Sequence, residues 1–236
     1  PRMYGDSVKL PLVVRTAVGG GRGYGPTHSQ TLDRLFMGIP GLRIVAPSLF
    51  HDAKDLLSSI LAQSQSPVIF SEHKLLYPQY PLLETNDSLI VRSLGEYLPT
   101  AAITNYRSGD PDVGIVTYGG SSLAVSEVMT QLTEEEINVA CAVPSSVKPL
   151  PIDDIVTALD GARAILVVEE GTAAHGWSSE VAAALTEKLW GQLATPIVRI
   201  GAADTPIPAA NALESKILPN ADNITEAVAE LIRCTQ

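Results

Sequence analysis

The first third of the chain alternates short apolar runs with amphipathic stretches. Residues 12–17, 43–46 and 68–70 are rich in Val, Ile and Leu, which predicts three strands. Apolar residues within 30–37 and 53–61 recur at helical spacing, which predicts two helices between those strands. The order strand, helix, strand, helix, strand predicts crossover connections and a parallel sheet that is covered by helices.

The second half of the chain repeats this alternation and predicts a second open α/β sheet. Its strands are predicted at 113–118, 138–143, 164–168 and 197–200. Its helices are predicted at 122–132, 152–159, 180–193 and 224–234. Between the two halves, a stretch rich in Pro, Asn, Asp, Ser and Gly predicts a link between domains, with one strand at 88–91.

Composition narrows the class of protein. With 45% hydrophobic and 18% charged residues, the 236-residue chain is not of the disordered class. A net charge of −10 argues against a nucleic-acid partner, which needs a basic face. The apolar stretches are too short to predict a membrane span. Two cysteines far apart, Cys141 and Cys234, favour a reducing compartment over a disulfide framework.

The glycine-rich loop 19–30 is the most unusual stretch. It has neither the Gly-Lys-Ser/Thr ending of a phosphate loop nor the glycine spacing of a dinucleotide fingerprint. It places His28 near a predicted helix N-terminus beyond a parallel strand, where open α/β sheets bind ligands. A helix N-terminus favours neutral imidazole, which can accept or donate a proton near neutral pH. The alternative is that His28 only packs in a turn.

The other histidines give weaker signals. His51 is expected on the surface at the start of a helix. His73 lies between Glu72 and Lys74, and a loop is an equally good alternative for it. His175 follows Glu169 and Glu170 in another strand-to-helix loop, where it belongs either to a site or to a flexible turn. The sequence has no Gly-x-Ser-x-Gly elbow, which argues against a serine hydrolase.

Several motifs together carry a family resemblance. The run VGGGRGYGPTHSQTLDRLFMGIPGLRIVAPS is followed by DAKDLL, SPVIF and EHKLLY, and the second half has YGG, VKPLPID, VVEEG, RIGAADTPIP and ILPNADNI. With these motifs, the chain resembles the beta subunit of the decarboxylating component of 2-oxo acid dehydrogenase complexes, such as pyruvate dehydrogenase. The resemblance covers nearly the whole chain.

This resemblance implies an α/β fold of the transketolase type. Residues 1–77 are expected to be the C-terminal part of a pyrimidine-binding domain, 78–111 a linker, and 112–236 a transketolase C-terminal-like domain. The family uses thiamine diphosphate and magnesium, held between alpha and beta subunits of an α2β2 heterotetramer. Its loop histidine corresponds to His28, with an implied acid/base or hydrogen-bonding role toward substrate, intermediate and lipoyl group.

The implied reaction is the oxidative decarboxylation of a 2-oxo acid and acyl transfer to a lipoyl group. The implied partners are an alpha subunit, a second beta subunit and the dihydrolipoyl acyltransferase. The acyltransferase's subunit-binding domain is often basic and suits the negative charge of this chain. The expected location is the cytoplasm or a mitochondrial or plastid matrix.

Two departures from the family bear on these expectations. The glutamate that activates the aminopyrimidine belongs to a segment before this chain begins, so we expect an N-terminally truncated piece that is inactive alone. In the loop where some relatives hold potassium, a family aspartate is replaced by Gln63, which leaves the carbonyls of Ile60 and Leu61 as candidate ligands.

Two alternatives stay open. One is another transketolase-superfamily enzyme, such as a deoxyxylulose phosphate synthase, against which the GPTHSQ and EHKLLY motifs argue. The other is a non-catalytic fragment that retains only assembly and docking.

Overall fold

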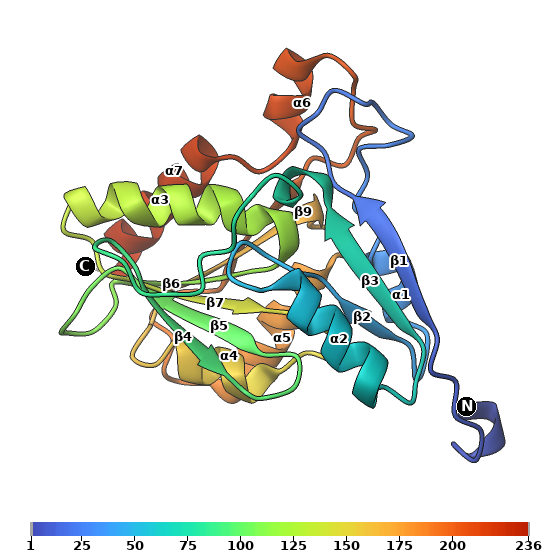
Figure 1. Cartoon of the computed structure of the whole chain (residues 1–236). Helices are drawn as coiled ribbons and strands as arrows, with labels where there is room; N and C mark the ends of the chain where they lie inside the picture. The colour runs from blue at the N-terminus through green and yellow to red at the C-terminus, as the bar shows by residue number, and fades with distance from the viewer. Residues whose placement is uncertain (1, 236) are drawn as a thin grey trace.

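The computed structural model describes residues 2–235, which form two β-sheets side by side with helices packed around them (Figure 1). The first sheet has the strand order β1-β3-β2-β8. Its strands are β1 (Val13–Val18), β2 (Arg43–Val45), β3 (Val68–His73) and β8 (Ser146–Lys148). The first three are parallel, as expected from crossover connections, and β8 is antiparallel to β2. Helices α1 (Arg34–Met37) and α2 (Ala53–Gln63) accompany this sheet.

The second sheet has the order β10-β9-β6-β7-β5-β4. Its strands are β4 (Ile90–Leu94), β5 (Thr100–Thr104), β6 (Val113–Thr117), β7 (Val139–Pro144), β9 (Ile165–Thr172) and β10 (Val198–Ala202). The four predicted strands β6, β7, β9 and β10 are parallel, while β5 and β4 extend the sheet antiparallel. The open α/β architecture predicted for this half is therefore confirmed.

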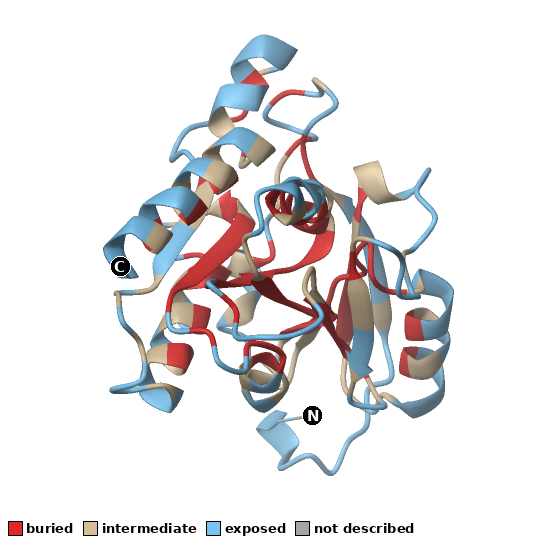
Figure 2. Ribbon diagram, turned by 90° about the vertical axis from the view of Figure 1, so that its left-hand side faces the viewer, coloured by how far each residue is buried: buried red, intermediate tan, exposed pale blue. Residues whose placement is uncertain are grey.

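Helices cover both faces of the second sheet. They are α3 (Ser122–Glu134), α4 (Ile152–Ala158), α5 (Trp177–Lys188) and α7 (Ala221–Thr235). Alternate side chains of β6 point to opposite faces, so that Ile115 packs with α3 and α7, whereas Val116 packs with α4 and α5. Two buried cores result, and Figure 2 shows the burial concentrated on these central strands.

The remaining helices are short. The 3-10 helices lie at Arg2–Tyr4 (η1), Lys74–Leu76 (η2) and Gly119–Ser121 (η3). Helix α6 (Asn211–Ile217) lies beside the glycine-rich loop that follows β1 (Figure 1). No helix among residues 2–235 is long and apolar enough to span a membrane.

The segment 78–111 differs from the linker with one strand that the sequence predicts. It contains β4 and β5, which are neighbouring strands of the second sheet. Strand β5 has the sequence TAAIT, whose alanines give a weak local strand signal. It is a strand because β7 and β4 pair with it from both sides.

Helices α1 and α5 differ most from their predicted bounds. The helix predicted at 30–37 is the single turn α1, whose Leu35 and Phe36 are exposed and gain little from burial. Helix α5 starts at Trp177, three residues before its predicted start, because the Glu169 side chain accepts hydrogen bonds from the amides of Trp177 and Ser178.

A loop held by two carboxylates as the candidate functional site

The glycine-rich loop leaves the end of β1 and returns to α1 past the top of the second sheet (Figure 1). Gly19 has a φ of +96°, a conformation that side chains rarely adopt. A Cβ atom at Gly19 would also lie 2.0 Å from Nε2 of His73. At this position the glycine is needed both for the backbone turn and for the close approach of an imidazole.

His73, at the end of β3, lies between two glycines. A Cβ atom at Gly120, after β6, would lie 2.2 Å from Cγ of His73. Nδ1 of His73 accepts a hydrogen bond from the amide of Leu75 (3.2 Å), which assigns the ring proton to Nε2. Nε2 then donates to Oε2 of Glu170 across 2.5 Å. His73 is thus a buried connector between the two sheets, at the end of a strand and not in the loop that the sequence left open as an alternative.

Glu170, near the end of β9, accepts three hydrogen bonds from the first half of the chain. Besides His73, its donors are the amide of Gly20 (3.0 Å) and the hydroxyl of Thr31 (2.6 Å). Burial acts to raise the pKa of Glu170, but His73, Thr31 and Gly20 together hold that pKa below its usual value. Glu170 is therefore an ionised acceptor at neutral pH.

Glu214 on α6 holds the middle of the same loop. Its carboxylate accepts from the amides of Gly21 (3.0 Å) and Gly23 (2.8 Å), and the residue is 2% exposed. No local pattern in the sequence indicates this contact, because Glu214 and the loop are separated by about 190 residues. Two carboxylates from the second half of the chain thus fix the loop's backbone.

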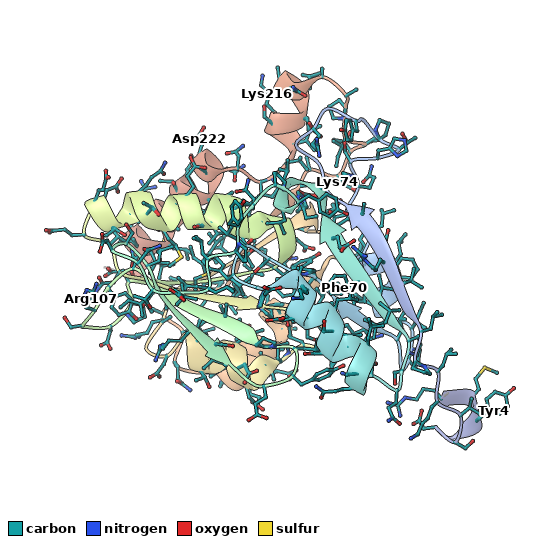
Figure 3. All side chains as sticks on the ribbon, in the orientation of Figure 1. Tyr4, Phe70, Lys74, Arg107, Lys216 and Asp222 are labelled. Carbon is teal, nitrogen blue, oxygen red and sulfur yellow. The ribbon has the colours of Figure 1, made fainter. Side chains whose placement is uncertain are left out.

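His28 lies in this fixed loop with its side chain exposed. Its carbonyl accepts a hydrogen bond from the ammonium of Lys74, which lies beside the loop in Figure 3. Helix α1 begins only at Arg34, so the prediction that His28 lies at a helix N-terminus is wrong. The imidazole faces a groove of about 630 Å³ that is also lined by Thr16, Gln30 and Lys74.

The groove has one carboxylate among its lining residues, Asp33. Its two oxygens accept hydrogen bonds from the hydroxyls of Ser71 (2.9 Å) and Tyr118 (3.3 Å). Burial raises the pKa of Asp33, against those two hydrogen bonds. Asp33 is 3% exposed and each of its oxygens already accepts a hydrogen bond, which disfavours direct proton exchange with a ligand in the groove.

The two other histidines lie away from this loop. His51 is buried, contrary to its predicted surface position, with Nδ1 2.7 Å from Oγ of Ser48 and Nε2 3.1 Å from the carbonyl of Pro99. Burial lowers the pKa of His51 to about 4, so its ring is neutral. His175 is exposed in a turn, while its neighbours Glu169 and Glu170 point into the protein.

The candidate potassium residues lie in the last turn of α2. Ile60 is buried and its carbonyl accepts from the amide of Ser64, whereas the Leu61 side chain is 65% exposed and Gln63 ends the helix. Among the described residues, no group of three or more His, Cys, Asp or Glu side chains is arranged to hold a metal ion.

Comparisons with known proteins agree with this geometry. The transketolase pyrimidine-binding domain matches residues 2–79, and the transketolase C-terminal domain matches residues 103–224. A solved split-gene transketolase, described as an inactive beta4 tetramer, superposes with a TM-score of 0.67 at 18% identity, over 100% of this chain and 72% of that one. The transketolase fold is therefore confirmed.

Two relatives narrow the family. The pyruvate dehydrogenase E1 component subunit beta of Porphyra purpurea is 33% identical over 232 residues, which are 98% of this chain and 67% of the relative. The acetoin:2,6-dichlorophenolindophenol oxidoreductase subunit beta of Bacillus subtilis is 31% identical over 98% of this chain and 64% of the relative. The chain spans about two thirds of the length of these relatives, and it belongs to the transketolase-like family of E1 component beta subunits of 2-oxo acid dehydrogenases.

Proposed function

We propose that this chain is the beta-subunit part of a thiamine diphosphate-dependent 2-oxo acid dehydrogenase and that His28 is its catalytic histidine. The reaction is the oxidative decarboxylation of a 2-oxo acid such as pyruvate, followed by acyl transfer to a lipoyl group. One observation supports the role of His28 most directly. Its imidazole is exposed on the groove, while its backbone is held by Lys74 and by the carboxylates that fix the loop.

The groove does not by itself provide a full cofactor site. In the family, a free carboxylate of the beta subunit activates the aminopyrimidine of thiamine diphosphate. The carboxylate that lines the groove belongs to Asp33, and it is engaged by Ser71 and Tyr118. The described residues therefore fit one part of a cofactor site that other residues complete. We assign the diphosphate and its magnesium to the alpha subunit.

The chemistry that this chain contributes is proton transfer and positioning. An imidazole that is exposed on the groove can donate a proton to a ligand or accept one from it. His28 would exchange a proton with a substrate or intermediate oxygen in the groove. Gln30 and Lys74 line the same groove and can bind the carboxylate or carbonyl oxygens of a 2-oxo acid.

The proposal includes partners and domains. The relatives are named as beta subunits, which supports an alpha subunit as partner. We further propose a second beta subunit and the dihydrolipoyl acyltransferase as partners. The proposed domains are 1–77 and 112–236, with 78–111 as the linker. The location that we propose is the cytoplasm or a mitochondrial or plastid matrix. One relative, in Arabidopsis thaliana, is named as mitochondrial and another is from a bacterium, which supports two of these locations.

Potassium is a lesser part of the proposal. We place it at the end of α2, on carbonyl oxygens of Ile60 and Leu61 and the side-chain oxygen of Gln63. The support is that the last carbonyls of a helix lack intrahelical partners and that hard cations prefer oxygen ligands. The carbonyl of Ile60 would have to share its hydrogen bond from the amide of Ser64.

The test is reconstitution of the chain with a matching alpha subunit, thiamine diphosphate and magnesium. Decarboxylation of pyruvate and of branched-chain oxo acids, and cleavage of acetoin, would each be followed with a dye as electron acceptor. We expect no activity from the chain alone, and activity with alpha only when the beta subunit also carries the preceding segment that bears the activating glutamate of the family. His28→Asn should lower kcat by about 10²- to 10⁴-fold, the usual contribution of a general acid or base.

His175→Asn is the matched control, because His175 is also an exposed loop histidine. Wild-type kcat for His28→Asn would contradict the catalytic role of His28. Stable association of alpha with a beta subunit that carries the activating segment, but no activity on any substrate, would contradict the catalytic proposal and leave the assembly role. Activity of the chain alone would contradict the need for a partner's residues.

A further inference from the structure

Glu169 and Glu170 are neighbours on β9 and point in opposite directions. Alternation along a strand places successive side chains on opposite faces of the sheet. Glu169 faces α5, where it accepts hydrogen bonds from the amides of Trp177 (3.1 Å) and Ser178 (2.9 Å). Glu170 faces the glycine-rich loop of the first half of the chain. The two carboxylates thus have the same chemistry but act on different parts of the molecule.

We propose that Glu170 is a positioning residue that fixes the loop carrying His28. This inference rests on the proposed role of His28. Glu170 accepts from Gly20 at the start of the loop and from Thr31 at its end, so one carboxylate holds both ends of the segment that contains His28. Closing a flexible loop at its two ends removes most of its conformational freedom.

The connection continues from Glu170 to the backbone of His28. Oε2 of Glu170 accepts from His73, whose next residue, Lys74, donates to the carbonyl of His28. The His73 ring lies so close to Gly19 and Gly120 that a Cβ atom at either glycine would clash with it, so this contact between the sheets requires both glycines. Glu170, His73 and Lys74 therefore form one linked set of contacts between the second sheet and His28.

The contact between His73 and Glu170 lies where the strand order of the second sheet reverses. Strands β7 and β9 lie on opposite sides of β6, so the chain reverses direction across the sheet at β6. In open α/β sheets, the crevice at such a point, beyond the carboxyl ends of the strands, is where ligands bind. Here His73 of the first sheet enters that crevice, between Gly120 after β6 and Glu170 on β9. The second sheet uses its ligand-binding position to hold the first sheet's loop.

Glu170 acts through the loop and not on the substrate. Its partners among the described residues are His73, Thr31 and Gly20, and it does not line the groove that His28 faces. If a neutral amide replaced the Glu170 carboxylate, its NH2 group would face at least one of the three donors. That hydrogen bond would then be lost. We therefore expect loss of Glu170 to mobilise the loop, and through it to lower turnover, without removing a proton-transfer group.

The first experiment is amide hydrogen exchange of the full chain, compared between Glu170→Gln and the matched control Glu169→Gln. We expect exchange within residues 19–31 to accelerate about tenfold or more in Glu170→Gln, the effect of losing one charge-assisted hydrogen bond. In Glu169→Gln we expect faster exchange at the start of α5 and unchanged exchange in 19–31. Unchanged exchange of 19–31 in Glu170→Gln, or equal acceleration in both variants, would overturn the proposal.

Thr31→Val provides a milder variant in case Glu170→Gln does not fold. It removes one of the three donors to Glu170 and keeps a side chain of similar shape. We expect exchange of 19–31 to accelerate by less than in Glu170→Gln, with α5 unchanged. Exchange of 19–31 at the wild-type rate in Thr31→Val would likewise count against the linkage.

The second experiment uses the assembly with alpha subunit. There Glu170→Gln should lower kcat about tenfold or more with a smaller change in KM, because misplacement of a catalytic group acts mainly on the transition state. Faster exchange in 19–31 with wild-type kcat would leave the loop linkage intact and contradict the role of His28. Unchanged exchange together with a wild-type kcat would overturn the linkage and leave the role of His28 intact.

Discussion

The two sheets of this protein differ most in their outer strands. In the second sheet, the edge strands β4 and β10 each have two exposed residues among five, and the interior strand β6 is buried throughout, with helices on both faces. In the first sheet, the edge strand β1 has four exposed residues among its six (Figure 2). The second sheet therefore contributes most of the buried apolar surface, and hence most of the hydrophobic stabilisation. The first sheet keeps a surface and the loop of His28 available for binding.

The loops that follow β6 and β1 also differ in what stabilises them. After β6, the chain turns within Gly119–Ser121 and enters the long helix α3. After β1, a loop of more than ten residues precedes the single turn α1. The short loop is stabilised by the helix that it begins. The long one depends on carboxylates of the second half, Glu170 and Glu214, for its shape.

The largest expected effect comes from the core of the second sheet. Ile115 on β6 is fully buried between α3 and α7. Ile115→Ala should lower the free energy of unfolding by about 2–5 kcal/mol through lost burial and a residual cavity. Urea denaturation followed by circular dichroism measures this. A loss below about 1 kcal/mol would contradict the view that this sheet carries the stability.

The next effect concerns the junction between the sheets. Ser48 follows β2 and Pro99 precedes β5, and His51 contacts both. Burial lowers the pKa of His51 from 6.5 to about 4. Between these two pH values, His51 is mostly protonated in the unfolded chain and mostly neutral in the folded chain. This stability is fully present above pH 6.5, and about 3 kcal/mol of it is lost as the pH falls to about 4.

The measurement is urea denaturation of wild type and His51→Gln from pH 7.5 to 4. The carboxylates that titrate in this range are present in both proteins, so the difference between the two curves isolates His51. The variant should be less stable at pH 7.5, because it loses the fit to Ser48 and Pro99, and it should lose less stability on acidification. Parallel curves for the two proteins would contradict a buried neutral ring.

The smallest effect is expected at the exposed edge. Val14 on β1 is 49% exposed. Val14→Ala should change the free energy of unfolding of the chain by no more than about 0.5 kcal/mol, as is usual for surface substitutions. The loss of unfolding free energy in Val14→Ala is compared with the loss in Ile115→Ala in the same urea series. The gap between the two losses measures how differently the two sites contribute to stability. A loss at Val14 as large as at Ile115 would remove that difference.

Much of the fold was predictable from local pattern. The strands β2, β6 and β10 and the helices α2 and α7 lie within a few residues of their predicted positions. Each of these has a clear apolar periodicity or a run of β-branched residues. Strand β8 (Ser146–Lys148) and helix α6 were not predicted, because both are short and carry weak periodicity. Their positions depend on neighbours from distant parts of the chain.

The site divides in the same way. His28 stands out in the sequence because so many glycines surround it, and the structure places it exposed beside a groove. Its supporting residues do not stand out. His73 and Glu170 are 97 residues apart, and Asp33 and Tyr118 are 85 apart. Single histidines and glutamates at such separations have no shared pattern.

The sequence by itself determined two α/β sheets, the family, and the loop that carries the candidate histidine. Those features are local: a helix or strand is encoded by the spacing of its own apolar residues, and a motif by adjacent residues. The tertiary structure alone decided that Glu169 begins a helix while Glu170 holds the loop of His28. The physical reason is that a carboxylate's role depends on the donors that folding brings to it, and these come from elsewhere in the chain.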